Sequence, residues 1–109
     1  MTTPRLTDAD RDQLLEQGFL VVPDVVPKAL CERSAQAICE FIGVDPAVPS
    51  TWRNYLKQGH GIVPLHHHQA LWDVRQLPAL HRVFSAIYRT ENLWVTLDRG
   101  SFKVPSHAH

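Results

Sequence analysis

The clearest signal in this chain is the stretch PKALCERSAQAICEFIG, residues 27–43. Apolar or small side chains recur in it at the 3.6-residue period of an α-helix, which predicts that one face packs on a core. That face carries Leu30, Ser34, Ala37, Ile38 and Phe41. Pro27 suits the first position of a helix, and Gly43 suits a left-handed end. The stretch therefore predicts an amphipathic helix that Gly43 closes.

Shorter helical signals lie on both sides of that stretch. Thr7 and Asp10 have the spacing of a capping box, and Gly18 stands where a helix over residues 8–17 would end. Further along, the pattern predicts helices over residues 51–56 and 69–76, and one that begins at Pro78. The last of these carries an apolar stripe, Leu80, Val83, Phe84, Ile87 and Tyr88.

Two segments have the composition of β-strands. Residues 19–22 form a short apolar run that ends at Pro23, and residues 93–104 form a longer apolar and mixed run. The order helix, strand, helices, strand predicts an α+β fold. No repeat or flexible linker divides residues 1–109, so we expect a single domain.

One face of the strand expected at residues 93–104 changes from apolar to polar and cationic along its length. Side chains alternate in a strand, so this face carries Leu93, Val95, Leu97, Arg99, Ser101 and Lys103. If the face points inward, its polar end would form one wall of an anion-binding pocket. The alternative is a strand that leaves the core for solvent.

Composition and charge exclude several classes of protein. Of the 109 residues, 44% are apolar, which suffices for a core. Eleven basic residues balance eleven acidic ones, so no net field favours nucleic acid or an anionic membrane. The start of the chain lacks the apolar run of a secretory signal, and no run is long enough to span a bilayer. Cys31 and Cys39 would lie about 12 Å apart on one helix, too far for a disulfide. We therefore expect a cytoplasmic protein.

Three segments of the chain, taken in order, carry a family resemblance. They are LTDADRDQLLEQGFLVVPDVVP at residues 6–27, HQALWDVRQLP at residues 68–78 and LWVTLDRGSFKVP at residues 93–105. In this order and spacing they resemble the N-terminal part of phytanoyl-CoA dioxygenase-like proteins. The resemblance spans nearly the whole chain.

The resemblance implies a double-stranded β-helix (jelly roll) oxygenase that uses Fe(II) and 2-oxoglutarate to hydroxylate an unactivated carbon. Two His and one carboxylate hold the iron in such enzymes. The first His and the carboxylate form a His-x-Asp pair shortly after a Lys-Pro segment. The second His, and an Arg that pairs with the cosubstrate, come much later. By the resemblance, Lys103 and with it Arg99 and Ser101 would lie near the cosubstrate.

The sequence departs from that pattern after Lys103. It has no His-x-Asp pair there. Between Lys103 and the last residue, His109, there is also no room for the distal His or for the Arg that pairs with the cosubstrate. We therefore expect an N-terminal helical part and the first strands of a jelly roll, truncated before the iron site. Such a fragment would have no catalytic or metal-binding residues, would hold no cofactor and would be inactive alone.

Seven histidines invite a metal hypothesis. In the run His66-His67-His68, a strand would place only His66 and His68 on one face, and two ligands are fewer than a transition-metal site normally uses. We expect a structural or solvent-facing role there, with adventitious metal binding as the alternative. His107 and His109 form a poor substitute for a His-x-Asp pair. A small histidine-based metal-binding protein stays open as a hypothesis.

The main alternative to an oxygenase fragment is a non-catalytic interaction module. Every predicted helix has an apolar stripe, yet the sequence offers little sheet on which those stripes could pack. Such a module would self-associate through exposed apolar side chains, of which the sequence suggests Phe41, Phe84, Tyr88 and Trp94.

Overall fold

The computed structural model describes residues 6–58, 61–97 and 99–104. Within these residues it contains five helices and one two-stranded antiparallel sheet, which confirms the α+β class. The elements in chain order are α1 (Asp8–Gln17), α2 (Lys28–Ile42), the 3₁₀ helix η1 (Pro49–Gln58), β1 (Ile62–Val63), α3 (Gln69–Arg75), α4 (Pro78–Tyr88) and β2 (Gly100–Ser101). None of these helices is long and apolar enough to cross a membrane.

Helix α1 has the predicted bounds and the predicted caps. The Thr7 N–H donates to Asp10 Oδ2 at 2.9 Å, and the Asp10 N–H donates to Thr7 Oγ1 at 3.1 Å, so the capping box is complete. Gly18 closes the helix at a φ of 79°. No residue of α1 is buried, and Leu15 is 83% exposed. Local hydrogen bonds therefore define this helix more than packing does.

Helix α2 confirms the central prediction, with its first turn beginning one residue after Pro27. Gly43 ends it at a φ of 71°, which a residue with a side chain rarely adopts. Ala37 and Ile42 are buried, and α2 packs on α3 and on η1. Helices α3 and α4 lie where the sequence predicts them, and η1 replaces the α-helix expected at residues 51–56.

A single cluster of buried side chains joins α2, α3 and the sheet. It consists of Ala37, Ile42, Val44, Val63, Leu65, Ala70 and Leu71. Trp52, Tyr55 and Phe102 pack against it from the side of η1 and the end of β2. The rings of Tyr55 and Phe102 lie 5.4 Å apart, centroid to centroid. The cluster therefore ties η1 and the sheet to α2.

The strand predictions are largely wrong. Residues 19–22 form no strand, and Phe19 and Val21 are exposed. Of the described residues at 93–97 and 99–104, only Gly100–Ser101 form a strand. They pair with Ile62–Val63, which the sequence did not predict. The absence of a side chain at Gly100 allows this close approach, because a Cβ there would lie 3.0 Å from Ile38 Cγ1 and the Ile38 side chain would have to shift.

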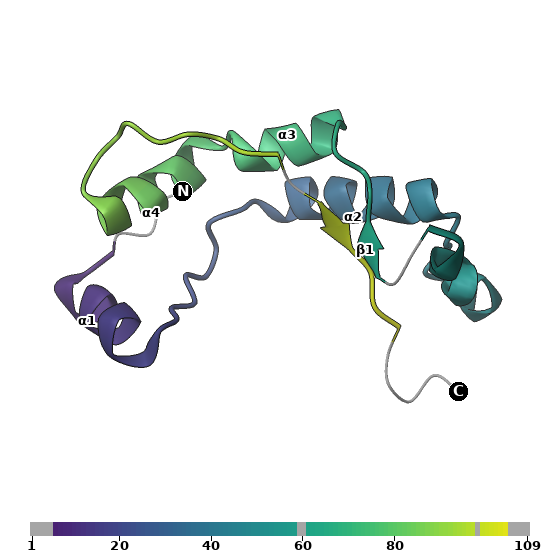
Figure 1. Cartoon of the computed structure of the whole chain (residues 1–109), viewed down its shortest axis with the longest axis horizontal. Helices are drawn as coiled ribbons and strands as arrows, with labels where there is room; N and C mark the ends of the chain where they lie inside the picture. Colours follow the sequence, from purple (N-terminus) through teal and green to yellow (C-terminus); the bar gives the residue numbers. More distant parts are fainter. Residues whose placement is uncertain (1–5, 59–60, 98, 105–109) are drawn as a thin grey trace.

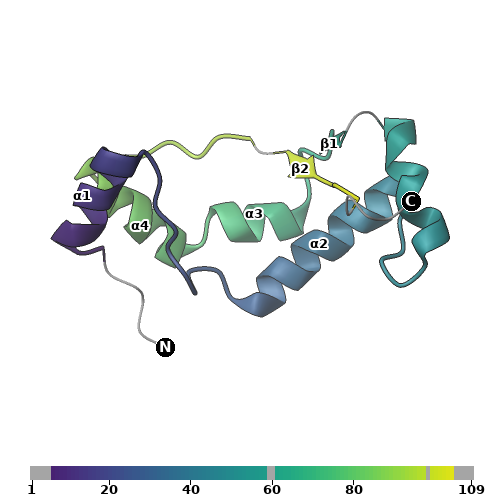
Figure 2. The ribbon, with the colours of Figure 1, turned by 90° about the horizontal axis from the view of Figure 1, so that it is seen from below.

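The molecule is elongated and open. Its extents are 46 × 30 × 26 Å, and its radius of gyration is 16.5 Å, against about 13 Å for a compact domain of this length. Figures 1 and 2 show α2, η1 and the sheet together at one end and α1 with α4 at the other, with α3 between them. We call α2, η1, β1, β2 and α3 the packed half, and α1, α4 and residues 19–26 and 89–97 the open half.

Candidate functional site

The three residues that the sequence assigns to a cosubstrate pocket lie on an exposed face. Arg99, Ser101 and Lys103 are all exposed, whereas Gly100 is buried and Phe102 is half-buried. The core therefore lies on the even-numbered side of this segment. At these positions the structure agrees with the alternative of a segment that faces solvent, not with an inward odd-numbered face. Ser101 pairs with Ile62 across the sheet. A role for the three residues beside a cosubstrate stays a prediction.

The histidine run serves the start of α3. His68 is the N-cap of that helix, and its Nδ1 accepts a hydrogen bond from the Ala70 N–H at 3.0 Å. His66 is half-buried and His67 is exposed. A His68 ring that caps a helix through Nδ1 has only Nε2 left for a metal ion.

The described residues do not fit an iron centre. No three or more His, Cys, Asp or Glu side chains among them are grouped so that they could hold a metal ion. His60, His107 and His109 lie outside the described residues.

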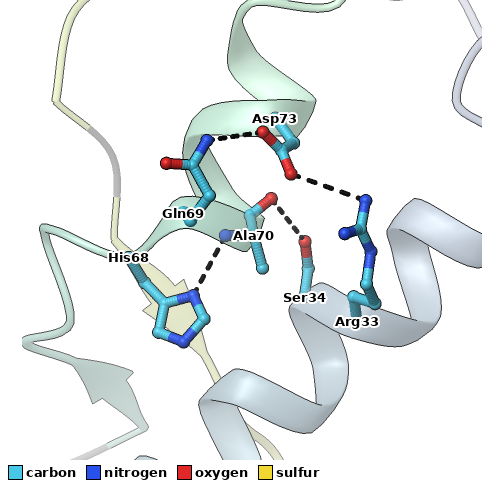
Figure 3. Close-up of polar contacts among 6 residues, drawn as sticks. All are labelled: Arg33, Ser34, His68, Gln69, Ala70 and Asp73. Carbon is cyan, nitrogen blue, oxygen red and sulfur yellow. Dashed lines mark hydrogen bonds and ion pairs between the residues drawn. The ribbon is translucent and has the colours of Figure 1, made fainter.

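Polar contacts join α2 to α3 on the outer side of the core (Figure 3). The Arg33 guanidinium lies 3.4 Å from Asp73 Oδ2, and the Ser34 hydroxyl donates to the Ala70 carbonyl at 3.3 Å. The Gln69 side-chain amide donates to Asp73 Oδ1 at 2.7 Å. Both oxygens of Asp73 are thus engaged with partners on these two helices. These contacts fix the two helices against each other.

A cleft lies in the open half, between α4 and the extended segment that follows it. Its volume is about 790 Å³. Leu80, Phe84 and Tyr88 of α4 form one wall, and residues 93–97 form the other. Figure 1 shows this segment running back over α4 and α3 toward β2. Arg75, at the end of α3, also lines the cleft.

Arg75 is the unusual residue of this cleft. Its three guanidinium nitrogens are buried and have no hydrogen-bond partner among the described residues. The guanidinium carbon lies 4.3 Å from the centre of the Trp72 ring, so the cation stacks on an aromatic face. Neither residue was predicted from the sequence to belong to a site, although their i,i+3 spacing on a predicted helix is a signal that could have indicated the pair.

The two cysteines differ in environment. Burial raises the pKa of the Cys39 thiol, and the nearby Asp45 carboxylate raises it further. Cys31 is exposed, and both residues are free thiols. Because the thiolate is the reactive form, this shift lowers the reactivity of Cys39.

Comparison with known proteins gives no relative. No family model, no curated protein and no solved structure matches this chain.

Proposed function

We propose that this chain forms the front part of a larger phytanoyl-CoA dioxygenase-like domain, whose jelly-roll strands would carry the Fe(II) and 2-oxoglutarate site. Three sequence segments in the order of that family motivate the proposal. Two of them fall on helices that the structure contains, α1 and α3, and the third reaches β2. The domain would hydroxylate an unactivated carbon once its metal ligands are supplied.

The observation that carries the proposal is the surface of the chain. It exposes 8357 Å², roughly a third more than the about 6,100 Å² of a compact monomer of this mass. Most of the large exposed apolar side chains lie in the open half. A monomer seldom leaves so much apolar surface uncovered, so further polypeptide is expected to cover it.

The sheet supports the same reading. Among the described residues, β1 pairs only with β2, so each strand has one edge without a neighbour. A two-stranded ribbon of this length is marginal in water, whereas further strands would satisfy both edges. The proposed jelly roll would supply such strands.

Two measurements test this proposal. The purified chain, given Fe(II) and 2-oxoglutarate, is expected to form no succinate above a control without protein, because its described residues hold no iron ligand set. Fe(II)-dependent succinate formation by the pure chain would contradict this. In addition, the DNA after codon 109 is expected to encode, in one frame, a His-x-Asp pair followed by a distal His and an Arg. Their absence from all three frames would remove the proposal.

We also assign the proposed domain to the cytoplasm. The sequence separation of Cys31 and Cys39 on α2 keeps the two thiols from forming an intramolecular disulfide, which agrees with a reducing compartment.

The second candidate function is an interaction module that self-associates. Trp94 is 96% exposed and Tyr88 is 65% exposed, and both line the cleft of the open half. Phe84, which the sequence also suggested, lines it with them. Sedimentation over a hundredfold range of concentration distinguishes the two functions. A module of this kind dimerises as concentration rises, and a well-folded monomer throughout would contradict it.

A further inference from the structure

We propose that the cleft between α4 and residues 93–97 binds a small carboxylate with an apolar body, whose head pairs with the guanidinium of Arg75. The proposal concerns the described chain itself and does not depend on iron or on the oxygenase assignment.

The unpartnered guanidinium indicates the charge of the ligand. Burying an unpaired cation is costly, and the usual compensation is an anion that accepts hydrogen bonds. The carboxylate closest along α3, Asp73, is already engaged by Arg33 and Gln69. Arg75 also lies in the last turn of α3, where the helix dipole favours a positive charge. A planar carboxylate matches the fork of the guanidinium with two parallel hydrogen bonds.

The walls of the cleft indicate the body of the ligand. Leu80, Phe84 and Tyr88 face the apolar residues of the 93–97 segment, and Arg75 is the one permanently charged side chain among the described residues that line the cleft. Its volume of about 790 Å³ lies in the range of small-molecule sites, roughly 300–1,000 Å³. Apolar walls with one fixed charge suit an amphiphile with a single anionic head.

The covering segment offers a route to the guanidinium. The Arg75 nitrogens are shielded from water, so a carboxylate reaches them only when neighbouring side chains shift, and residues 93–97 line the same cleft. That segment is weakly held. Leu93 donates one backbone hydrogen bond to the Glu91 carbonyl at 3.0 Å, and residues 94–97 make no backbone hydrogen bond to other described residues. Opening therefore breaks few interactions, and the exposed Trp94 ring would close over the apolar body of a bound ligand.

The experiment compares decanoate with decan-1-ol on the 109-residue chain by isothermal titration calorimetry. The two probes share an apolar body, and only decanoate carries the charge. Decanoate is expected to bind at least about tenfold more tightly, because a hydrogen bond to a charged group is worth one to two orders of magnitude in affinity. Tryptophan emission should shift to shorter wavelength with decanoate, and Trp94→Phe should remove most of that shift.

Two substitutions of the cation locate the site. Arg75→Met keeps much of the apolar stem and removes the charge, so it should abolish the preference for decanoate over decan-1-ol. Arg75→Lys keeps the charge without the fork and should retain part of it. Arg53→Met, on an exposed arginine of η1, is the matched control and should change neither affinity. Circular dichroism of each variant verifies folding.

Three results would overturn the proposal. The first is equal affinity for the two probes in the unmodified chain. The second is a decanoate preference that Arg75→Met and Arg53→Met leave equally intact. The third concerns a dimer seen by sedimentation. If decanoate leaves that dimer intact and Arg75→Met dissociates it, the carboxylate that pairs with Arg75 belongs to a second copy of the chain.

Discussion

The two halves of this molecule have similar helices and opposite packing. Among the described residues, seven of the eight buried apolar side chains form the cluster of the packed half, and Val83 of α4 is the other. In the open half, Leu15, Val21 and Trp94 are between 76% and 96% exposed. Amphipathic α4 thus finds no complete partner surface, whereas amphipathic α2 finds α3, η1 and the sheet. A helical pattern is enough to form a helix, but a core needs a second face that meets it.

The largest expected effect comes from truncating one leucine in each half. Leu71→Ala in α3 should lower the free energy of unfolding by about 2–4 kcal/mol, because it leaves a cavity in the buried cluster. Leu97→Ala in the open half should cost less than about 1 kcal/mol, because that side chain is already 57% exposed. Urea unfolding followed by circular dichroism measures both. Equal losses would mean that the open half is packed in solution as tightly as the packed half, and would contradict the difference between them.

The next effect concerns the crossing of β2 over α2. Gly100→Ala should cost about 1–3 kcal/mol, since the new Cβ would lie 3.0 Å from Ile38 Cγ1 and 3.5 Å from Val63 Cβ. Ser101→Ala, one residue further on an exposed position, is the matched control and should stay within about 0.5 kcal/mol. An unchanged unfolding midpoint in Gly100→Ala would show that β2 does not pack closely against Ile38 and Val63.

Local signals explain which elements could be predicted from the sequence. Thr7, Asp10 and Gly18 fix both ends of α1 by hydrogen bonds within a few residues, so a sequence pattern contains all the information needed. Gly43 does the same for the end of α2, and Pro78, whose ring fixes φ at a helical value, marks the start of α4. These elements are confirmed with bounds within one or two residues.

Non-local pairing explains what could not be predicted. Ile62 pairs with Ser101 although α3 and α4 lie between them in the chain, and nothing near either residue in the sequence specifies that partner. The outward orientation of Arg99, Ser101 and Lys103 follows from the same contact. Gly100 lies against Ile38, so the odd-numbered side chains on either side of it face away from the core. Arg75 was missed for a related reason, because its burial depends on residues far along the chain that cover it.

A third prediction tests whether Arg75 is strained in the free chain. Arg75→Met should raise the free energy of unfolding by about 1 kcal/mol, because relief of an unpaired buried charge outweighs the lost stacking on Trp72. Thermal unfolding measures the change, with Arg53→Met as the control that should leave stability unaltered. A loss of stability in Arg75→Met would mean that stacking alone satisfies the cation.

The smallest effect isolates the backbone of the open half. Arg89 caps α4 in the left-handed region, at a φ of 56°, where a side chain costs about 1–2 kcal/mol. Arg89→Gly removes that cost but increases the conformational entropy of the unfolded chain. The free energy of unfolding should therefore rise by about 0.5 kcal/mol. Arg89→Ala keeps the Cβ and removes the rest of the side chain, so the left-handed conformation stays costly and the substitution should give no gain.

Hydrogen exchange shows where the gain from Arg89→Gly falls. If the two halves are loosely coupled, amides of α4 should become better protected while those of α2 stay as they are. Equal protection of both helices would show that they unfold as one cooperative unit, so that the open half is held by the packed half in spite of its exposed apolar surface. The same substitution thus measures whether α4 unfolds together with the packed half or independently of it.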